Sequence, residues 1–91
     1  MNEGGRLMLR RVYIDVLAQF HAGRVRPVSL TLEDGRQYVI DRVTDVRRAP
    51  SKSGGAGLRY TCVILEREVA LYFDEWENVW WYDGRKGGNP A

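Results

Sequence analysis

Apolar and polar residues alternate along most of the chain, with the two-residue period of β-strands. Residues 11–20 (RVYIDVLAQF) place apolar side chains at every second position, and residues 25–33 (VRPVSLTLE) alternate in the same way. A helix over residues 11–20 is the competing interpretation, but the β-branched and aromatic residues at its start disfavour it. Pro27 lacks an amide hydrogen, so the second segment begins late or lies at a sheet edge. The pattern therefore predicts two strands joined by a turn at residues 21–24.

An Asp34–Gly35 pair separates the second strand from the third. Asp-Gly between two alternating segments predicts a two-residue hairpin, because glycine adopts positive φ without steric cost. The third strand, residues 36–48, is long, and Val43 falls on the opposite parity from Tyr38 and Ile40. We therefore expect a bulge near residues 41–42, which would let one strand serve both halves of a small barrel.

The rest of the chain continues the strand pattern, without a segment of helical period. A loop is predicted at residues 49–57 (APSKSGGAG), and the remaining strands and turns alternate at residues 58–65, 66–67, 68–73, 74–78 and 79–82. Six strands joined mostly by short turns predict an all-β fold, a small antiparallel barrel of about six strands of the SH3-like or split-barrel type. We expect one domain at residues 11–83, with flexible tails at residues 1–10 and 84–91.

The size and composition exclude several classes of protein. The chain has 91 residues, 44 % of them hydrophobic and 29 % charged, which is typical of a globular domain and not of a disordered or collagen-like one. No apolar run approaches the ~20 residues of a membrane span, and no signal peptide is recognisable. A domain this small buries only about 60–65 % of its unfolded surface, so we expect no deep substrate pocket and consider self-association a reasonable default.

Few residues are suited to catalysis or metal binding. His21 is the single histidine and falls in a predicted turn, while Cys62 is the single cysteine and falls within an apolar strand. A single cysteine cannot form an intrachain disulfide, and one cysteine with one histidine cannot supply the four ligands of a structural zinc site. One free cysteine suits the reducing cytoplasm. Asp41 and Asp45 could form a carboxylate pair, but ordinary ion pairing explains them better. We predict no catalytic residue, no metal site and no cofactor, and we consider an enzyme unlikely.

Basic residues gather on both sides of the glycine-rich loop, and their balance is unusual. Twelve of the fourteen basic residues are arginines, which favour phosphate contacts, although a GC-rich genome also explains the excess. The loop has the small residues of a phosphate cradle, but it lacks the P-loop sequence and a following helix. A flexible connection between strands is therefore the favoured interpretation, and contact with an anion or nucleic acid is the alternative. We expect five basic side chains to meet at one barrel end as candidates for nucleic-acid or anion contact: Arg42, Arg47, Arg48, Lys52 and Arg59.

Aromatic residues are concentrated near the end of the predicted barrel. Trp80, Trp81 and Tyr82 are consecutive, so strand alternation must direct at least one of them outward, and Trp76 lies in an acidic turn. Exposed tryptophan often marks an interface or a base-stacking surface. A thin barrel core also needs large side chains, so these four residues could instead belong to the core. Self-association and contact with a ligand or nucleic acid are the other two interpretations of the patch.

Three stretches together give the chain a resemblance to known proteins. These are RPVSLTLEDGRQYVIDRVTDVRRA, GGAGLRYTC and ALYFDEWENVWWY, between Val25 and Tyr82. They resemble small bacterial all-β domains of unknown function and, more distantly, the short C-terminal β domain of some bacterial Y-family-like DNA polymerases. The resemblance lies in the order of strands and supplies no functional residue, but it implies an association with DNA.

The sequence thus predicts a non-enzymatic binding module in the cytoplasm, with nucleic acid as its favoured partner and no membrane contact. The alternative is a protein–protein or self-assembly module that uses an aromatic patch between Trp76 and Tyr82.

Overall fold

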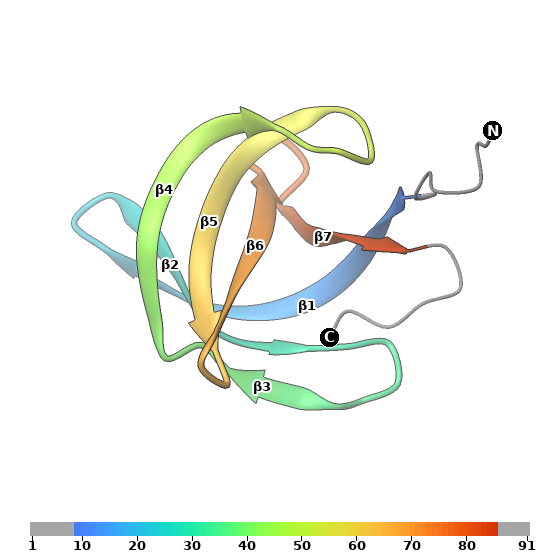
Figure 1. Ribbon diagram of the computed structural model, residues 1–91. Coiled ribbons are helices and arrows are strands. Elements are labelled where there is room, and N and C mark those ends of the chain that lie inside the picture. The colour runs from blue at the N-terminus through green and yellow to red at the C-terminus, as the bar shows by residue number, and fades with distance from the viewer. Residues whose placement is uncertain (1–8, 86–91) are drawn as a thin grey trace, which may run out of the picture.

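The computed structural model describes residues 9–85, and this part of the chain is all-β (Figure 1). Its strands are β1 (Leu9–His21), β2 (Arg24–Thr31), β3 (Gln37–Val39), β4 (Arg42–Pro50), β5 (Ala56–Ile64), β6 (Arg67–Asp74) and β7 (Val79–Arg85). They form one antiparallel sheet in the order β3-β2-β1-β7-β6-β5-β4, which curls into a half-barrel. The predicted all-β, antiparallel, barrel-like architecture is confirmed, with seven strands where six were expected.

The additional strand arises where the sequence predicted one long, bulged strand at residues 36–48. The chain leaves β3 and enters β4 across only two residues, which bond to opposite sides of the sheet. Ile40 donates its amide hydrogen to the carbonyl of Val28 at 2.9 Å, and Asp41 donates to the carbonyl of Val63 at 2.8 Å. The predicted break is therefore correctly placed, but it separates two strands. A register shift in β4 lies slightly later, between Val43 and Asp45.

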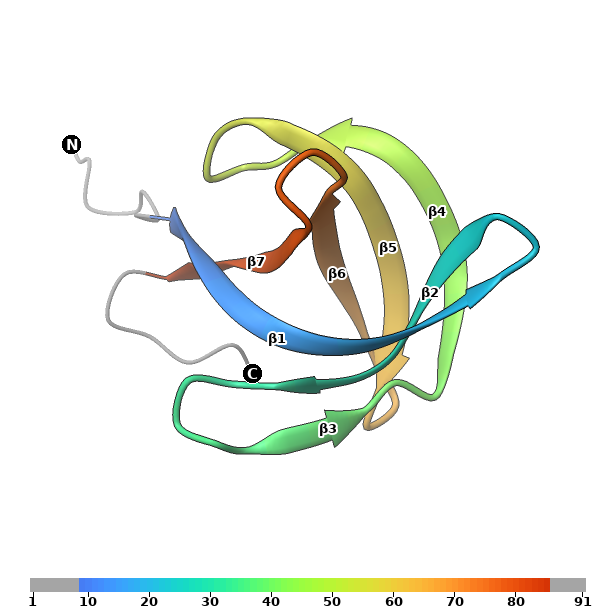
Figure 2. The ribbon, with the colours of Figure 1, turned by 180° about the vertical axis from the view of Figure 1, so that it is seen from behind.

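Strand β1 connects the two portions of the half-barrel. Its residues 9–14 pair with β7, whereas its residues 15–21 pair with β2. A register shift between Leu17 and Ala18 lies in the second of these ladders. Figure 2 shows β1 sweeping from β7 out to the projecting hairpin that it forms with β2. The length of β1 lets one strand serve both portions, the task that the sequence had suggested for residues 36–48.

The turns differ in detail from the expected ones. Asp34 and Gly35 lie in a three-residue loop, because Leu32 and Arg36 still form a backbone hydrogen bond of 2.9 Å, so the predicted two-residue turn is wrong. The tight turn after β5 consists of Leu65 and Glu66, one residue earlier than predicted, since Ile64 pairs with Arg67. Both turn residues have positive φ, 51° and 64°, a region that non-glycine residues rarely adopt.

The core lies on the inner, concave face of the sheet. Trp80 is its centre, with ring centroids 5.1 Å from Tyr60 and 4.6 Å from Phe73. Tyr60 also donates its hydroxyl hydrogen to the carbonyl of Val25 at 2.8 Å, which links β5 to β2 across the barrel. Burial of such large side chains compensates for the small number of residues in the domain.

The strands extend slightly beyond the predicted domain. Leu9 pairs with Arg85, and Arg10 pairs with Gly84, so the ordered unit includes two residues at each end that were assigned to the tails. The remainder of both predicted tails lies outside the described residues. The described part of the chain contains no helix that is long and apolar enough to cross a membrane.

Candidate functional site

Trp81 occupies the outer, convex face of the sheet, where the sequence predicted an exposed aromatic side chain. It is opposite in parity to Trp80 and Tyr82, but its side chain is fully buried. Tyr72 stacks against it with centroids 5.4 Å apart, and the Arg11 guanidinium lies 4.0 Å from the centre of its ring. The indole N–H donates to the Ser51 hydroxyl at 3.3 Å. The outward direction is thus as predicted, whereas the exposure is not.

The glycine-rich loop covers Trp81 because a carboxylate holds it in place. The Asp83 carboxylate accepts hydrogen bonds from the Ser51 hydroxyl at 2.6 Å, from the Ser53 hydroxyl, and from the amides of Lys52 and Ser53 at 3.0 and 3.2 Å. Arg11 closes the other side by donating to the carbonyl of Gly54 at 2.9 Å. The loop therefore holds an anion, and this anion is part of the protein.

The hydrogen bonds of this cradle lower the pKa of Asp83. Partial burial by itself would raise the pKa of the Asp83 carboxyl, but the hydrogen bonds from Ser51, Ser53 and the two amides outweigh that effect and lower it. The carboxylate is consequently ionised at neutral pH. A second anion, such as a nucleic-acid phosphate, would find these donors already engaged.

The aromatic candidates separate into three buried residues and one exposed residue. Trp80 and Tyr82 are buried on the inner face and Trp81 on the outer face, so none of the three offers a surface for base stacking or self-association. Trp76 is 95 % exposed at the tip of the β6–β7 turn. The Asp74 carboxylate fixes that turn by accepting from the amides of Trp76 and Glu77 at 2.8 and 3.2 Å. The predicted aromatic patch is reduced to Trp76.

The five basic candidates do not gather at one barrel end. Arg48 lies on the same face as Leu58, opposite to Arg47, and its guanidinium pairs with Glu75 at 2.8 Å. Arg42 is five residues from Arg47, or roughly 16 Å along the strand. Lys52 is exposed on the loop, with its backbone amide bound to Asp83. The predicted single cluster is wrong because alternation and strand length disperse it.

Two of the candidates are nevertheless brought together. Arg47 in β4 and Arg59 in β5 are direct cross-strand partners, so their side chains leave the outer face side by side. Asp45 binds Arg47 at 2.7 Å and raises the pKa of its guanidinium. The Arg59 Nε is buried and has no hydrogen-bond partner among the described residues. Like charges directly opposite each other destabilise a sheet, and among the described residues Asp45 offsets this repulsion at Arg47.

The structure places Cys62 and His21 in different environments. Cys62 is fully buried on the inner face, and burial raises the pKa of its thiol from 9.0 to about 11, so the nucleophilic thiolate is scarce at neutral pH. His21 is exposed at the end of β1. Within residues 9–85, no three histidine, cysteine or carboxylate side chains are grouped as a metal site would require.

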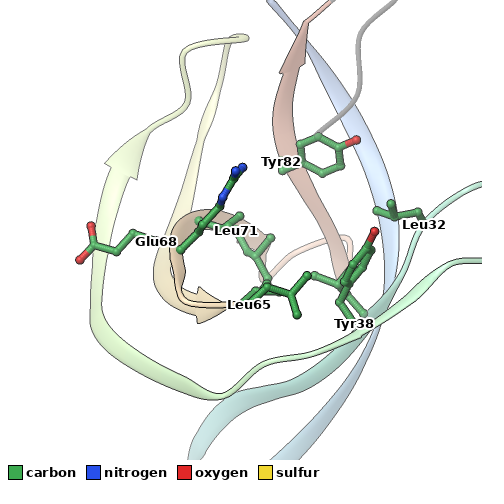
Figure 3. Close-up of a pocket in the computed structure, with 10 residues that line it drawn as sticks. Leu32, Tyr38, Leu65, Glu68, Leu71 and Tyr82 are labelled. Carbon is green, nitrogen blue, oxygen red and sulfur yellow. The ribbon is translucent and has the colours of Figure 1, made fainter. Parts of the chain in front are cut away.

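An apolar pocket of about 510 Å³ opens on the concave side, which the small size of the chain had not led us to expect. Figure 3 shows Tyr82, Leu32 and Tyr38 facing Leu65 and Leu71 across it. The full lining comprises Leu30, Leu32, Tyr38, Ile64, Leu65, Arg67, Glu68, Val69, Leu71 and Tyr82. No local motif marks the pocket in the sequence, since its walls come from separate strands and alternate like ordinary core positions.

Comparisons with known proteins add no family to this description. No family model, no curated protein and no solved structure matches the chain. The resemblance to a polymerase-linked β domain therefore stays a prediction.

Proposed function

We propose that this protein is a non-enzymatic binding module of the cytoplasm that contacts the phosphate backbone of nucleic acid with the outer face of β4 and β5. The observation that carries the proposal is the direct cross-strand pairing of Arg47 with Arg59. Two guanidinium groups on directly paired residues are suited to bind a phosphate. Each guanidinium can contact the phosphate through a fork of N–H donors.

The charge around this pair supports a backbone contact. Arg42 belongs to the same face, because it pairs with Val63, two positions on from Thr61 and four from Arg59. The outer face of β4 and β5 thus has three arginines and one carboxylate, Asp45. Arginines that share one face of two neighbouring strands can contact a phosphate chain without reading its bases. The mode of binding is electrostatic, with neither stacking nor a sequence preference.

Fluorescence anisotropy with labelled single- and double-stranded DNA at two salt concentrations tests this proposal. We expect dissociation constants of about 10⁻⁴–10⁻⁶ M that weaken steeply with salt. The variant R47Q should reduce the slope of log K against log salt by roughly one. The matched control R26Q removes an exposed arginine from β2 and should leave the slope unchanged. Absence of salt-sensitive binding, or equal effects of R47Q and R26Q, would overturn the proposal.

A second candidate function is a protein–protein or self-assembly contact through Trp76. Its support is the 95 % exposure of a tryptophan that the Asp74 hydrogen bonds hold in a defined turn. Tryptophan is enriched at the energetic centres of interfaces. Light scattering after size-exclusion chromatography tests self-assembly: the parent should form a concentration-dependent oligomer that W76A dissociates. A parent chain that stays monomeric at high concentration would contradict self-assembly.

A further inference from the structure

The apolar pocket lies where the half-barrel is open, between the β2–β3 hairpin and the β5–β6 hairpin (Figure 3). Its volume of about 510 Å³ is within the range of roughly 300–1,000 Å³ that is typical of small-molecule sites. Most of its walls are leucine, isoleucine and valine side chains. A space of this kind favours an aliphatic or aromatic ligand body over a polar one.

The pocket lining contains one cation, Arg67, and one carboxylate, Glu68, and the strand register directs them to opposite faces of the β5–β6 hairpin. Arg67 pairs with Ile64 and therefore shares the inner face with it, whereas Glu68 pairs with Val63 and faces outward. Figure 3 shows the Glu68 carboxylate directed away from the other labelled side chains. The described residues offer Arg67 no ion-pair partner. Arg67 is thus the charged lining residue that the register places on the inner face of the hairpin.

Two tyrosines add polar groups to an otherwise apolar wall. Tyr38 is the cross-strand partner of Leu30, and Tyr82 is on the inner face of β7. Burial is the largest of the effects that raise the pKa of Tyr82, so its hydroxyl stays neutral and can donate a hydrogen bond to an anion.

Leu65 supplies an independent observation at the mouth of the pocket. It occupies a turn position with φ of 51°, where glycine or asparagine is preferred, and its side chain is 70 % exposed. A leucine there strains the backbone and leaves apolar surface in water. Such strain is typical of ligand-binding positions, and here the leucine would gain contacts when the pocket is filled.

We propose that this pocket binds a small amphipathic anion, an aliphatic chain with a carboxylate head, with the chain among the inner-face leucines and the carboxylate at Arg67. This site is separate from the proposed nucleic-acid face of β4 and β5, because the two lie on opposite faces of the sheet. Leu65 closes over the aliphatic chain and fixes it at the pocket mouth.

Isothermal titration calorimetry with decanoate is the test, with decanol and decylammonium as the neutral and cationic counterparts. We expect decanoate to bind most tightly, and R67Q to weaken it about fivefold while leaving decanol unchanged. The control R26Q should affect neither. The variant L65N should raise the melting temperature of the ligand-free protein and weaken decanoate binding, two opposite changes that a merely structural residue would not produce.

Three results would overturn the proposal. These are absence of decanoate binding to the folded parent protein, equal affinity for decanoate and decylammonium, and equal affinity of R67Q and the parent for decanoate. A loss of stability in L65N would contradict the role assigned to Leu65. Nucleic-acid binding by R67Q should equal that of the parent protein. Failure of the proposed ligand pocket can therefore be distinguished from failure of the proposed nucleic-acid function.

Discussion

The Asp83 cradle makes a quantitative prediction about the stability of the loop at residues 51–55. The variant D83N has nearly the same shape but no charge, and its amide group offers one acceptor oxygen in place of two. It can keep the bonds that one oxygen receives from Ser51 and Ser53, but it loses the Lys52 amide, bound at 3.0 Å by the other oxygen. The bonds that remain also lose their charge-assisted strength.

The expected cost follows from these bonds. A hydrogen bond to a charged group contributes about 1.5–3 kcal/mol, and water can partly replace the carboxylate at the exposed Lys52 amide. We therefore expect D83N to lower the free energy of unfolding by about 2 kcal/mol. In a domain of this size that corresponds to a melting temperature lower by roughly 8–16 °C.

Thermal and urea unfolding followed by circular dichroism measure this difference, with D15N as the control, because Asp15 is an exposed carboxylate of β1. D15N should change the free energy of unfolding by less than about 0.5 kcal/mol. The pKa of Asp83 in the folded protein lies below the ordinary value of 3.8. Its contribution is therefore fully present above that value and is lost as pH falls through the folded pKa. A D83N loss no larger than that of D15N, or one that persists unchanged in acid, would refute the reasoning.

Three further predictions concern positions outside the proposed sites. Ala22 has φ of 52° in the β1–β2 turn, so A22N should stabilise the protein by about 0.5–1 kcal/mol and A22V should destabilise it, both measured by urea unfolding. At Gly57 a Cβ would lie 2.8 Å from the Phe73 carbonyl oxygen, so G57A should lower the free energy of unfolding by about 1–3 kcal/mol in the same assay. A difference within experimental error would contradict the close approach. Burial raises the pKa of Cys62 from 9.0 to about 11, so at neutral pH the folded protein has roughly one hundredth of the thiolate of the unfolded chain. Iodoacetamide should therefore alkylate the folded protein at least a hundredfold more slowly than the urea-unfolded chain. Equal rates would show that the thiol is not buried.

Local sequence patterns were informative for strands that bury one face in the core and expose the other. The alternation in residues 11–20 and 25–33 correctly gave strands, and the parity change before Val43 correctly marked a break. The same patterns misjudged Trp81, because alternation states which side a residue faces but not what covers that side. A loop more than twenty-five residues earlier in the chain, held by Asp83, buries it.

The candidate basic site shows the same limit. Proximity in sequence suggested that five basic residues would meet, yet Arg47 and Arg48 face opposite sides and Glu75, from a distant turn, binds Arg48. The pairing on which the proposed function rests, Arg47 with Arg59, depends on the register of β4 and β5, which a shift between Val43 and Asp45 adjusts. A single residue of slippage would have placed these side chains on opposite faces.

The sequence by itself determined the fold class and the approximate strand boundaries, because these depend on residue type and on a period of two. Only the tertiary structure decided that the anion of the glycine-rich loop is Asp83, that Trp76 is the exposed tryptophan, and that a pocket with Arg67 at its rim opens in the half-barrel. The physical reason is that cradles, covers and pockets are made by side chains from distant strands, and their positions follow from register and curvature, not from local pattern.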